Sequence, residues 1–451
     1  MNFVSKEFWF VFLAVAFAYF LARRFLENKG SWDRRFLLAL SLLLFACESW
    51  VSFSIFLALG CWIYFLLLSY PRASLTAKKF LQVAGVSVAL APLIFFKYWR
   101  TTEGIPIGLS FYTFQLLSLF FDSIRNQSAA PSFRDYWSYA SFFPQIVAGP
   151  IERRTSLLPQ LQHFEFQWNQ VQLQKGIQFL VLGFFYKLVV ADNLAGSSNW
   201  ITSQTDNAWA IHAGNFLFGF RIYFDFCGYS LIAFGLAALI GIKLTLNFRS
   251  PYWQVNPQEF WRCWHVSLSR WFRDYLYIPL GGNQARFPAL LILLVFTVSG
   301  IWHGAGWNFV IWGMAHGVLL VVYRSLSARM KLPKPVAWGG TLFAMMTCWL
   351  AFYQTDFEVL SQKWQTLFHF KAYLQNPYPE FVRLAGGLGN LAYALTAVLI
   401  AVFILLLEGV GVKKHQDGYG WSHHRGIQVA LILATVILAP VENNGFVYFD
   451  F

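Results

Sequence analysis

The sequence predicts an all-α membrane protein that crosses the bilayer many times. Hydrophobic residues make up 57% of the 451 residues and charged residues only 12%, with a mean hydropathy of +0.48. A soluble domain carries about 25% charged residues. Apolar runs close to the ~20 residues that a helix needs to cross a bilayer recur along the whole chain. We therefore predict one polytopic bundle, residues 1–451, as a single domain.

The apolar runs give the positions of the expected spans. Candidate spans lie at residues 8–21, 35–46, 49–70, 79–96, 176–190, 212–224, 229–242, 290–301, 308–323, 336–352, 388–407 and 426–440. We expect about 11 transmembrane helices among these twelve runs. The first run lacks the basic start and cleavage site of a signal peptide, so we expect it to be retained.

Two regions depart from this pattern of spans. Between residues 104 and 150, glycine and proline interrupt the apolar pattern at both ends. Re-entrant or half-length helices, which need protein or water around their backbone, are expected there. Residues 355–384 are more polar and aromatic, which predicts an interfacial loop with a short helix.

The basic residues predict the orientation in the membrane. The formal net charge is +13, but the basic residues are dispersed, which argues against nucleic-acid binding. Basic clusters at residues 23–35 and 72–79 are separated by two predicted helices. The positive-inside rule places both in the cytoplasm and the N-terminus outside. The five cysteines are scattered through apolar runs without metal-ligand spacing, so no metal site is predicted.

One histidine stands between two apolar runs. Residues 290–301 carry Trp302, His303 and Gly304 to membrane depth, and a second apolar run follows from Trp307. An ionisable side chain at that depth is costly, so it indicates a functional site. Histidine, with a pKa of about 6.5, suits general-base catalysis near neutral pH. A buried histidine satisfied by a carbonyl group is the structural alternative.

A second histidine lies in an aromatic and arginine-rich segment, residues 256–283. Wound as one helix, this segment has an apolar stripe and a neighbouring polar stripe. The polar stripe comprises Arg262, His265, Ser269 and Arg273, and the apolar one Trp261, Trp264, Leu268, Trp271, Phe272 and Tyr275. Such a helix suits the membrane interface. His316 would lie on the far side of a continuous helix from His303, so we expect it to be structural.

These segments resemble the membrane-bound O-acyltransferase family, in the branch formed by membrane subunits of bacterial polysaccharide O-acetylation systems such as that of alginate. The matching motifs are GLSFYTFQ (108–115), FFPQIVAGPI (142–151), FWRCWHVSL (260–268), RDYLYIPLGG (273–282) and WHGAGWN (302–308). The resemblance covers nearly the whole chain and includes the aromatic C-terminus. The chain departs from the family at residues 353–354, where Tyr-Gln replaces the expected Phe-Arg.

The resemblance implies a bundle around a central funnel or tunnel and an acyl-transfer reaction. An acetyl group would pass from cytoplasmic acetyl-CoA across the bacterial inner membrane to a periplasmic SGNH-type acetyltransferase partner. That partner would then acetylate a polysaccharide such as alginate, peptidoglycan or cellulose. His303 would act as the base where the funnel meets the outer opening. His265 would orient the donor, stabilise the oxyanion or pack structurally.

The resemblance also implies donor-binding residues, and it leaves alternatives open. Arg262, Arg270 and Arg273 would contact coenzyme A phosphates or lipid headgroups, while Trp302 and Asn308 would shape the pocket. D-alanyl transfer to teichoic acids is the alternative reaction. A transporter is the alternative class, although the sequence lacks the internal repeats that many transporters have. The residues do not decide whether an acyl-histidine forms or the partner attacks the donor directly.

Overall fold

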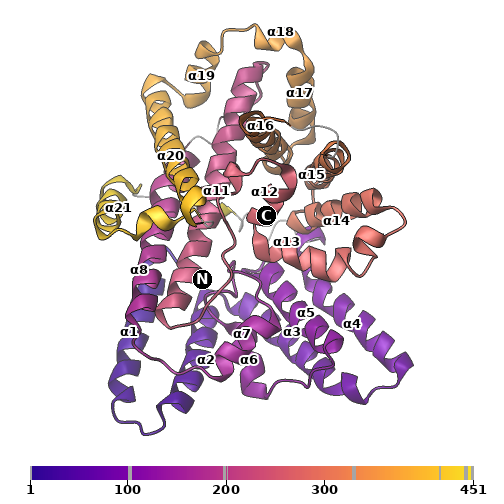
Figure 1. The fold of residues 1–451 in the computed structure, drawn as a ribbon, viewed down its shortest axis with the longest axis vertical. Coiled ribbons are helices and arrows are strands. Elements are labelled where there is room, and N and C mark those ends of the chain that lie inside the picture. Colours follow the sequence, from indigo (N-terminus) through magenta and orange to yellow (C-terminus); the bar gives the residue numbers. More distant parts are fainter. Residues whose placement is uncertain are drawn as a thin grey trace. The chain divides into compact units, whose positions relative to one another are not determined.

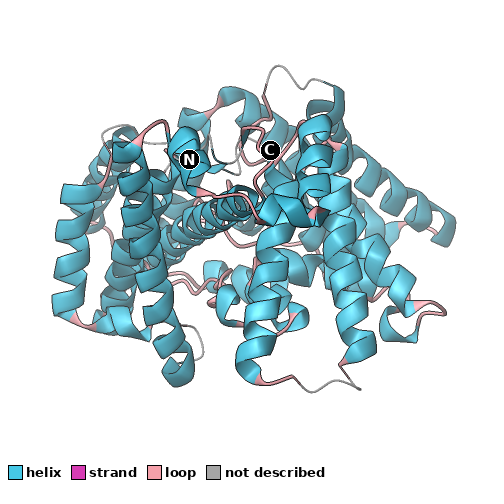
Figure 2. Ribbon diagram, turned by 90° about the horizontal axis from the view of Figure 1, so that it is seen from above, coloured by secondary structure: helices cyan, strands magenta, loops and turns pink. Residues whose placement is uncertain are grey.

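The protein is helical throughout the part that its computed structural model describes. That part comprises residues 3–99, 104–196, 200, 202–327, 332–415, 418–440 and 445–447, and it contains no β-strand (Figure 2). The predicted all-α fold is confirmed. The chain divides into two compact units, the first containing Met1–Leu180 and Tyr229–Leu246, the second Val181–Gly228 and Asn247–Val447.

Seven helices in the described residues are long and apolar enough to cross a bilayer. They are Trp50–Arg72, Leu75–Trp99, Gln170–Ala195, Ala208–Leu239, Trp307–Leu326, Lys334–Tyr353 and Leu388–Val412. Two shorter apolar helices, Pro288–His303 and Arg425–Leu438, coincide with further predicted spans. Many apolar helices are therefore present, while the total of about 11 crossings stays a prediction.

One expected pair of spans is a single helix. The predicted segments 212–224 and 229–242 belong to α11 (Ala208–Leu239), which runs for 32 residues without a break. At 1.5 Å per residue this is about 48 Å, longer than the ~30 Å hydrocarbon core. The prediction of two spans was wrong because the polar residues between them do not end a helix. Asp225 stays in the helix by pairing with Lys187.

The helices of the first unit are α1 (Lys6–Arg23), α2 (Lys29–Glu48), α3 (Trp50–Ser69), α4 (Leu75–Ile94), α5 (Leu109–Arg125), α6 (Phe133–Ser141), α7 (Arg154–Gln162) and the first part of α8 (Gln170–Phe184). Helices that follow one another from α1 to α5 pack together, and α3 also packs against α5 and α2 against α6 (Figure 1). Side-chain oxygens of Ser5, Asn28, Ser49, Ser74 and Ser132 cap five of these helix starts. Such caps satisfy N–H groups that have no partner inside the helix.

The region from 104 to 150 differs from the half-helix prediction. Residues 109–125 form an uninterrupted helix of 17 residues, α5, most of whose side chains are buried. Residues 142–150 form turns rather than a half-length helix, although all of them are buried. Pro144 lacks an N–H group, and Gly149 approaches it so closely that a Cβ would lie 2.3 Å from the Pro144 carbonyl oxygen. The buried Gln145 side chain donates to the Tyr139 carbonyl at 2.7 Å.

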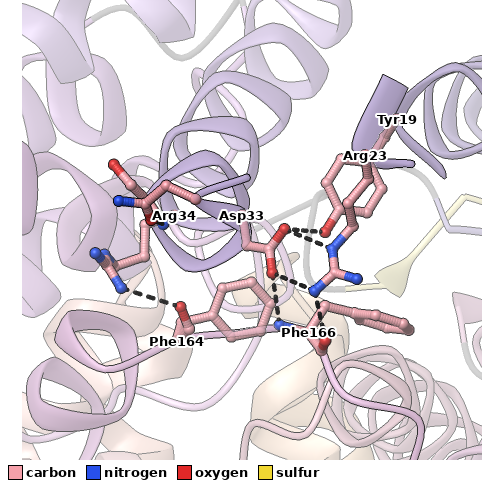
Figure 3. A network of polar contacts seen from close by, with 8 residues as sticks. Tyr19, Arg23, Asp33, Arg34, Phe164 and Phe166 are labelled. Atoms are coloured by element: carbon pink, nitrogen blue, oxygen red, sulfur yellow. Dashed lines mark hydrogen bonds and ion pairs between the residues drawn. The ribbon is translucent and has the colours of Figure 1, made fainter. Parts of the chain in front are cut away.

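A buried carboxylate joins α1, α2 and a later loop of the first unit (Figure 3). Asp33 is fully buried and accepts from Tyr19 Oη at 2.6 Å, from Arg23 Nε at 2.9 Å and from the Phe166 N–H at 2.9 Å. Arg23 Nη2 also donates to the Phe166 carbonyl at 2.9 Å. One charge pair therefore holds two helices and the loop together.

The second unit contains the remaining helices. After the π-helical stretch Phe185–Ala191 come α9 (Asp192–Ala195), the first part of α11, α12 (Pro257–Cys263), α13 (Val266–Phe272), α14 (Pro288–His303), α15 (Trp307–Leu326), α16 (Lys334–Tyr353), α17 (Phe357–Phe368), α18 (Phe370–Tyr373), α19 (Tyr378–Ala385), α20 (Leu388–His415) and α21 (Arg425–Leu438). The segment 355–384, predicted as a loop with one short helix, contains α17, α18 and most of α19. Asp356 caps α17 by accepting from two N–H groups. The polar composition of the segment does not by itself indicate that a helix begins there.

Helices α14 and α15 pack against each other as a hairpin through glycines. A Cβ on Gly300 would lie 2.1 Å from the Phe309 carbonyl oxygen, and one on Gly313 would lie 2.3 Å from the Phe296 carbonyl oxygen. Gly313 and Gly317 form a GxxxG pair, the spacing that lets membrane helices approach closely. No larger residue fits at Gly300 or Gly313 without moving the other helix.

Two polar clusters are buried inside the second unit. Lys187 pairs with Asp192 at 2.6 Å and with Asp225 at 2.7 Å. Glu408, fully buried in the apolar helix α20, accepts from Tyr186 Oη at 2.5 Å and from Tyr223 Oη at 2.8 Å. Since polar groups in an apolar interior are costly unless they are paired, these clusters fix how the helices of this unit pack.

Replacing Asp33 by alanine should destabilise the protein strongly. The change leaves the Tyr19 hydroxyl, Arg23 and the Phe166 N–H without their shared acceptor, and breaking such a buried pair costs about 3–5 kcal/mol. Thermal unfolding of the detergent-solubilised protein measures the effect, with the exposed Glu27→Ala variant as control. Equal stability of the two variants would contradict the role assigned to Asp33.

Adding one methyl group at Gly300 should also lower stability. Overpacking of this kind costs about 1–3 kcal/mol, because the Phe309 carbonyl cannot move without displacing α15. Gly339→Ala on α16 is the matched control, since its Cβ would meet nothing within 4 Å and alanine favours a helix. The unfolding temperature should fall for Gly300→Ala and stay equal or rise for Gly339→Ala. The reverse order would refute the close packing of the hairpin.

Candidate active site

The segment around His265 is bent rather than one continuous helix. Helix α12 ends at Cys263, α13 begins at Val266, and His265 between them has φ +41° and ψ 57°. The prediction of one amphipathic helix over this segment was therefore wrong. A left-handed backbone costs a non-glycine residue roughly 1–2 kcal/mol, a cost that sequence periodicity does not reveal. The bend is one of three positive-φ non-glycine positions in the described residues.

His303 is the last residue of α14 and lies at the turn of the hairpin. Gly304 and Gly306 separate it from Trp307, where α15 begins. A side chain at position 304 would overlap the Phe309 ring, because a Cβ there lies 2.1 Å from that ring. The glycine therefore allows α15 to return directly beside His303. The imidazole is buried, with 4% of its surface exposed.

Aromatic rings surround the His303 imidazole edge-on. The ring centroids of Trp302, Trp312 and Phe352 lie 4.7, 4.9 and 5.2 Å from that of His303. Asn308 is buried and donates from Nδ2 to the Phe352 carbonyl at 3.4 Å. These contacts join α14, α15 and α16 around the histidine and leave it accessible from one side.

That side is a cavity of about 570 Å³ inside the second unit. Both predicted catalytic histidines, His265 and His303, line it. Its wall also includes all three predicted donor-binding arginines, Arg262, Arg270 and Arg273. Trp302 and Asn308, the other two predicted donor contacts, are not among the lining residues.

The cavity is strongly cationic. Arg249 and Arg324 join the three predicted arginines, and no aspartate or glutamate is among the lining residues. Arg262 pairs with Glu259 and Arg273 with Asp274, each at 2.6 Å, on exposed side chains. Exposed pairs of this kind are worth little and can exchange partners readily.

A polar corner completes the cavity lining. The carboxamide oxygen of Asn283 accepts from Tyr277 Oη and from Arg324 Nη2, each at 2.9 Å. Arg249 and Arg324 were not predicted from the sequence because both lie outside the segment 256–283, Arg249 shortly before it and Arg324 on α15. An arginine in the last turn of the apolar helix α15 was the available signal for Arg324.

The His265 side chain lies in a buried, apolar environment. His265 is 1% exposed, and its ring meets Phe226 edge-on at 4.6 Å. Burial lowers the pKa of His265 to about 3, so its imidazole is neutral at physiological pH. A neutral imidazole can both donate and accept one hydrogen bond.

His316 lies close to the same aromatic cluster, which corrects its predicted position. The expected continuous helix between His303 and His316 is broken at Gly304, and α15 packs back along α14. His316 contacts the rings of Trp312 and Trp261, both with centroids at 4.9 Å. Trp261 lines the cavity and His316 does not, so His316 supports the wall from behind.

Residues 353–354, where the chain departs from the family pattern, make hydrogen bonds to uncharged groups. Tyr353 Oη donates to Asn215 Oδ1 at 2.8 Å, and Gln354 Nε2 donates to the Thr202 carbonyl at 3.3 Å. Lys363 of α17 places its Nζ 5.8 Å from the centre of the Tyr353 ring. A charged side chain is therefore present beside this segment, although residue 354 is neutral.

Polar side chains of the first unit hold its backbone segments together. Gln115 Nε2 donates to the Glu152 carbonyl at 3.0 Å, and Arg154 Nη2 donates to the Ala129 carbonyl at 2.7 Å. Arg154 also donates to the Ser123 hydroxyl. Among the described residues, no group of three or more His, Cys, Asp or Glu side chains could hold a metal ion.

The chain is similar to known acyltransferases. It is 31% identical over 409 residues to the peptidoglycan O-acetyltransferase of Helicobacter pylori, covering 79% of this chain and 77% of that protein. It is 31% identical to the probable alginate O-acetylase AlgI of Pseudomonas putida, covering 82% and 81%. The teichoic acid D-alanyltransferase of Bacillus subtilis is 29% identical over 48% of this chain and 58% of that protein.

The family profile gives the same result over most of the chain. The profile described as MBOAT, membrane-bound O-acyltransferase family, matches residues 22–355. This range includes both histidines, the cavity lining and parts of both units. The transporter alternative loses its support, since the relatives are named for acyl transfer. The chain is an O-acyltransferase and belongs to the membrane-bound O-acyltransferase family.

Proposed function

We propose that this protein transfers acetyl groups from acetyl-CoA toward an extracytoplasmic polysaccharide. The observation that carries the proposal is the cavity, which brings two buried histidines together with five arginines and no carboxylate. Relatives named for peptidoglycan and alginate O-acetylation match more of the chain than the D-alanyltransferases do. This difference favours acetyl transfer over D-alanyl transfer.

His303 is the proposed general base. Its ring is held by three aromatic neighbours and reaches the cavity from one direction, so it has a fixed geometry toward a bound thioester. The hydroxyl group that receives the acetyl attacks the thioester carbonyl. His303 accepts the proton of this hydroxyl as the new C–O bond forms. The C–S bond then breaks, and the proton passes from His303 to the departing coenzyme A sulfur. Atoms and charge balance without any further reactant.

His265 is proposed to stabilise the charge that develops during this reaction. Burial keeps its imidazole neutral, and a neutral imidazole N–H can donate to the oxyanion formed from the thioester carbonyl. Because His265 is buried, such a donor is worth more there than it would be in solution. His265 would then act as the hydrogen-bond donor and His303 as the base.

The arginines are proposed to bind the phosphates of acetyl-CoA. A coenzyme A molecule carries a diphosphate and a 3′-phosphate, and guanidinium groups bind phosphate oxygens in a bidentate manner. Arg324 donates to the Asn283 carboxamide oxygen, while Arg262 and Arg273 have exposed carboxylate partners that a phosphate group can replace. All the lining residues belong to the second unit.

The wider arrangement follows from the sequence and the relatives. We propose that residues 1–451 act as one domain in the bacterial inner membrane, with the N-terminus outside and the arginine cavity open to the cytoplasm. A periplasmic acetyltransferase of the SGNH type would receive the acetyl group and pass it to a polysaccharide. The family match across parts of both units supports a single catalytic domain.

Replacing His303 by alanine should abolish O-acetylation of the surface glycan. Loss of a general base lowers rates by about 10²–10⁴-fold. The measurement is the O-acetyl content of glycans from a deletion strain that carries each variant at matched membrane levels. His369→Ala, at an exposed loop position, is the control and should restore acetylation fully. Full restoration by His303→Ala would refute the proposed base.

Replacing Arg249 and Arg324 together by glutamine should weaken donor binding more than the chemical step. Two lost charge-assisted hydrogen bonds, each worth about 1.5–3 kcal/mol, predict at least a tenfold rise in KM for acetyl-CoA. Acetyl-CoA-dependent coenzyme A release from membranes gives KM and kcat. Arg425→Gln, at an exposed position, controls for the loss of positive charge. An unchanged KM would show that the donor does not bind in this cavity.

A further inference from the structure

Helix α13 begins without a cap of its own. The residue before its first turn is His265, whose backbone is left-handed and whose side chain makes no capping hydrogen bond. The first N–H groups of a helix have no acceptor inside the helix, and the preceding residue usually supplies one. Another part of the chain must therefore accept from the start of α13.

Asn247 supplies both acceptors. Its backbone carbonyl accepts from the Val266 N–H at 2.9 Å, and its side-chain Oδ1 accepts from the Ser267 N–H at 3.1 Å. The side chain is buried, with 1% of its surface exposed. Asn247, 20 positions before Ser267, thus caps the start of α13, a role that the residue directly before the first turn usually has.

The same segment also holds the other side of the bend. The Arg249 N–H donates to the Cys263 carbonyl at 3.0 Å, where α12 ends. Residues 247–249 therefore contact the backbone directly before and directly after the pair Trp264 and His265. Their hydrogen bonds fix a backbone conformation that His265 would rarely adopt alone.

The direction of the His265 side chain depends on this conformation. A helical or extended backbone at residue 265 would send the imidazole elsewhere, away from its edge-on contact with Phe226 and from the cavity. We propose that Asn247 is a positioning residue that holds the His265 imidazole at the cavity wall. The inference rests on the proposed acetyl-transfer function and adds a residue that the sequence motifs do not include.

Three substitutions separate positioning from general stability. Asn247→Leu keeps the approximate size but removes the side-chain acceptor, whereas Asn247→Asp keeps an oxygen in the same place. Asn207→Leu is the matched control, because Asn207 is also buried in this unit and accepts from the Ala210 N–H at 3.1 Å. Its cap lies at the start of α11, and its side chain does not line the cavity.

The expected result is a selective loss of turnover. In membranes supplied with acetyl-CoA, Asn247→Leu should lower kcat by about tenfold or more, since displacement of a catalytic group by 1 Å can cost about 10². KM for acetyl-CoA should stay within about twofold, because the arginines remain. Asn247→Asp should retain most of the activity and Asn207→Leu all of it. An equal loss for Asn247→Asp and Asn247→Leu would overturn the proposal.

A double-mutant cycle tests whether Asn247 acts through His265. Adding Asn247→Leu to His265→Ala should cause no further loss, whereas independent roles would multiply the two losses. Multiplied losses would therefore overturn the inference. If Asn247→Leu does not accumulate in membranes, Asn247→Ala takes its place in the same cycle.

The two proposals fail in different ways. If His265→Ala keeps full activity while His303→Ala has none, the acetyl-transfer function stands and the positioning role falls. If His303→Ala also acetylates normally, the proposed function itself is wrong. If all Asn247 variants match the wild type while His265→Ala is inactive, only the positioning role is refuted.

Discussion

The close approach of α14 and α15 is the contact on which the candidate site depends. Gly300 and Gly313 let the backbone of each helix lie against the other, so α15 returns directly alongside α14. His303 consequently falls at the turn of the hairpin, where rings from α14, α15 and α16 enclose it. With larger residues at these positions the helices would separate, and His303 would lose its aromatic surroundings. Packing by small residues is a common way for membrane helices to associate, because hydrophobic burial contributes little between helices in lipid.

Polar groups in the apolar interior impose a second constraint. Glu408 accepts from two tyrosines, and Lys187 lies between two aspartates. Each of these groups would be costly if it were left without a partner. Their pairing limits the ways in which α11 and α20 can pack in the second unit. The bend at His265 follows the same rule, because the N–H groups that it exposes find acceptors on Asn247.

The arginines and the histidines of the cavity differ in charge and in burial. The arginines are partly exposed, and in the proposed function they would attract the phosphates of the donor over about a Debye length of 8–10 Å. The histidines are almost completely buried, which keeps His265 neutral. A donor with a charged end and an uncharged thioester end fits this arrangement. In the proposed function, the cavity would orient the acyl donor as well as bind it.

The sequence by itself determined the helical membrane fold, most of the apolar spans and both histidines of the site. These features depend on composition and on short motifs, such as the WHG triplet at residues 302–304, which are local properties. The tertiary structure alone decided that α11 is one helix, because the contacts of Asp225 with Lys187 and with the Val447 N–H show why this aspartate can remain inside it. It also decided the bend at His265 and the presence of Arg249 and Arg324 in the cavity. Hydrogen bonds and charges that join residues far apart in the chain leave no periodic signal, so only the folded structure brings them together.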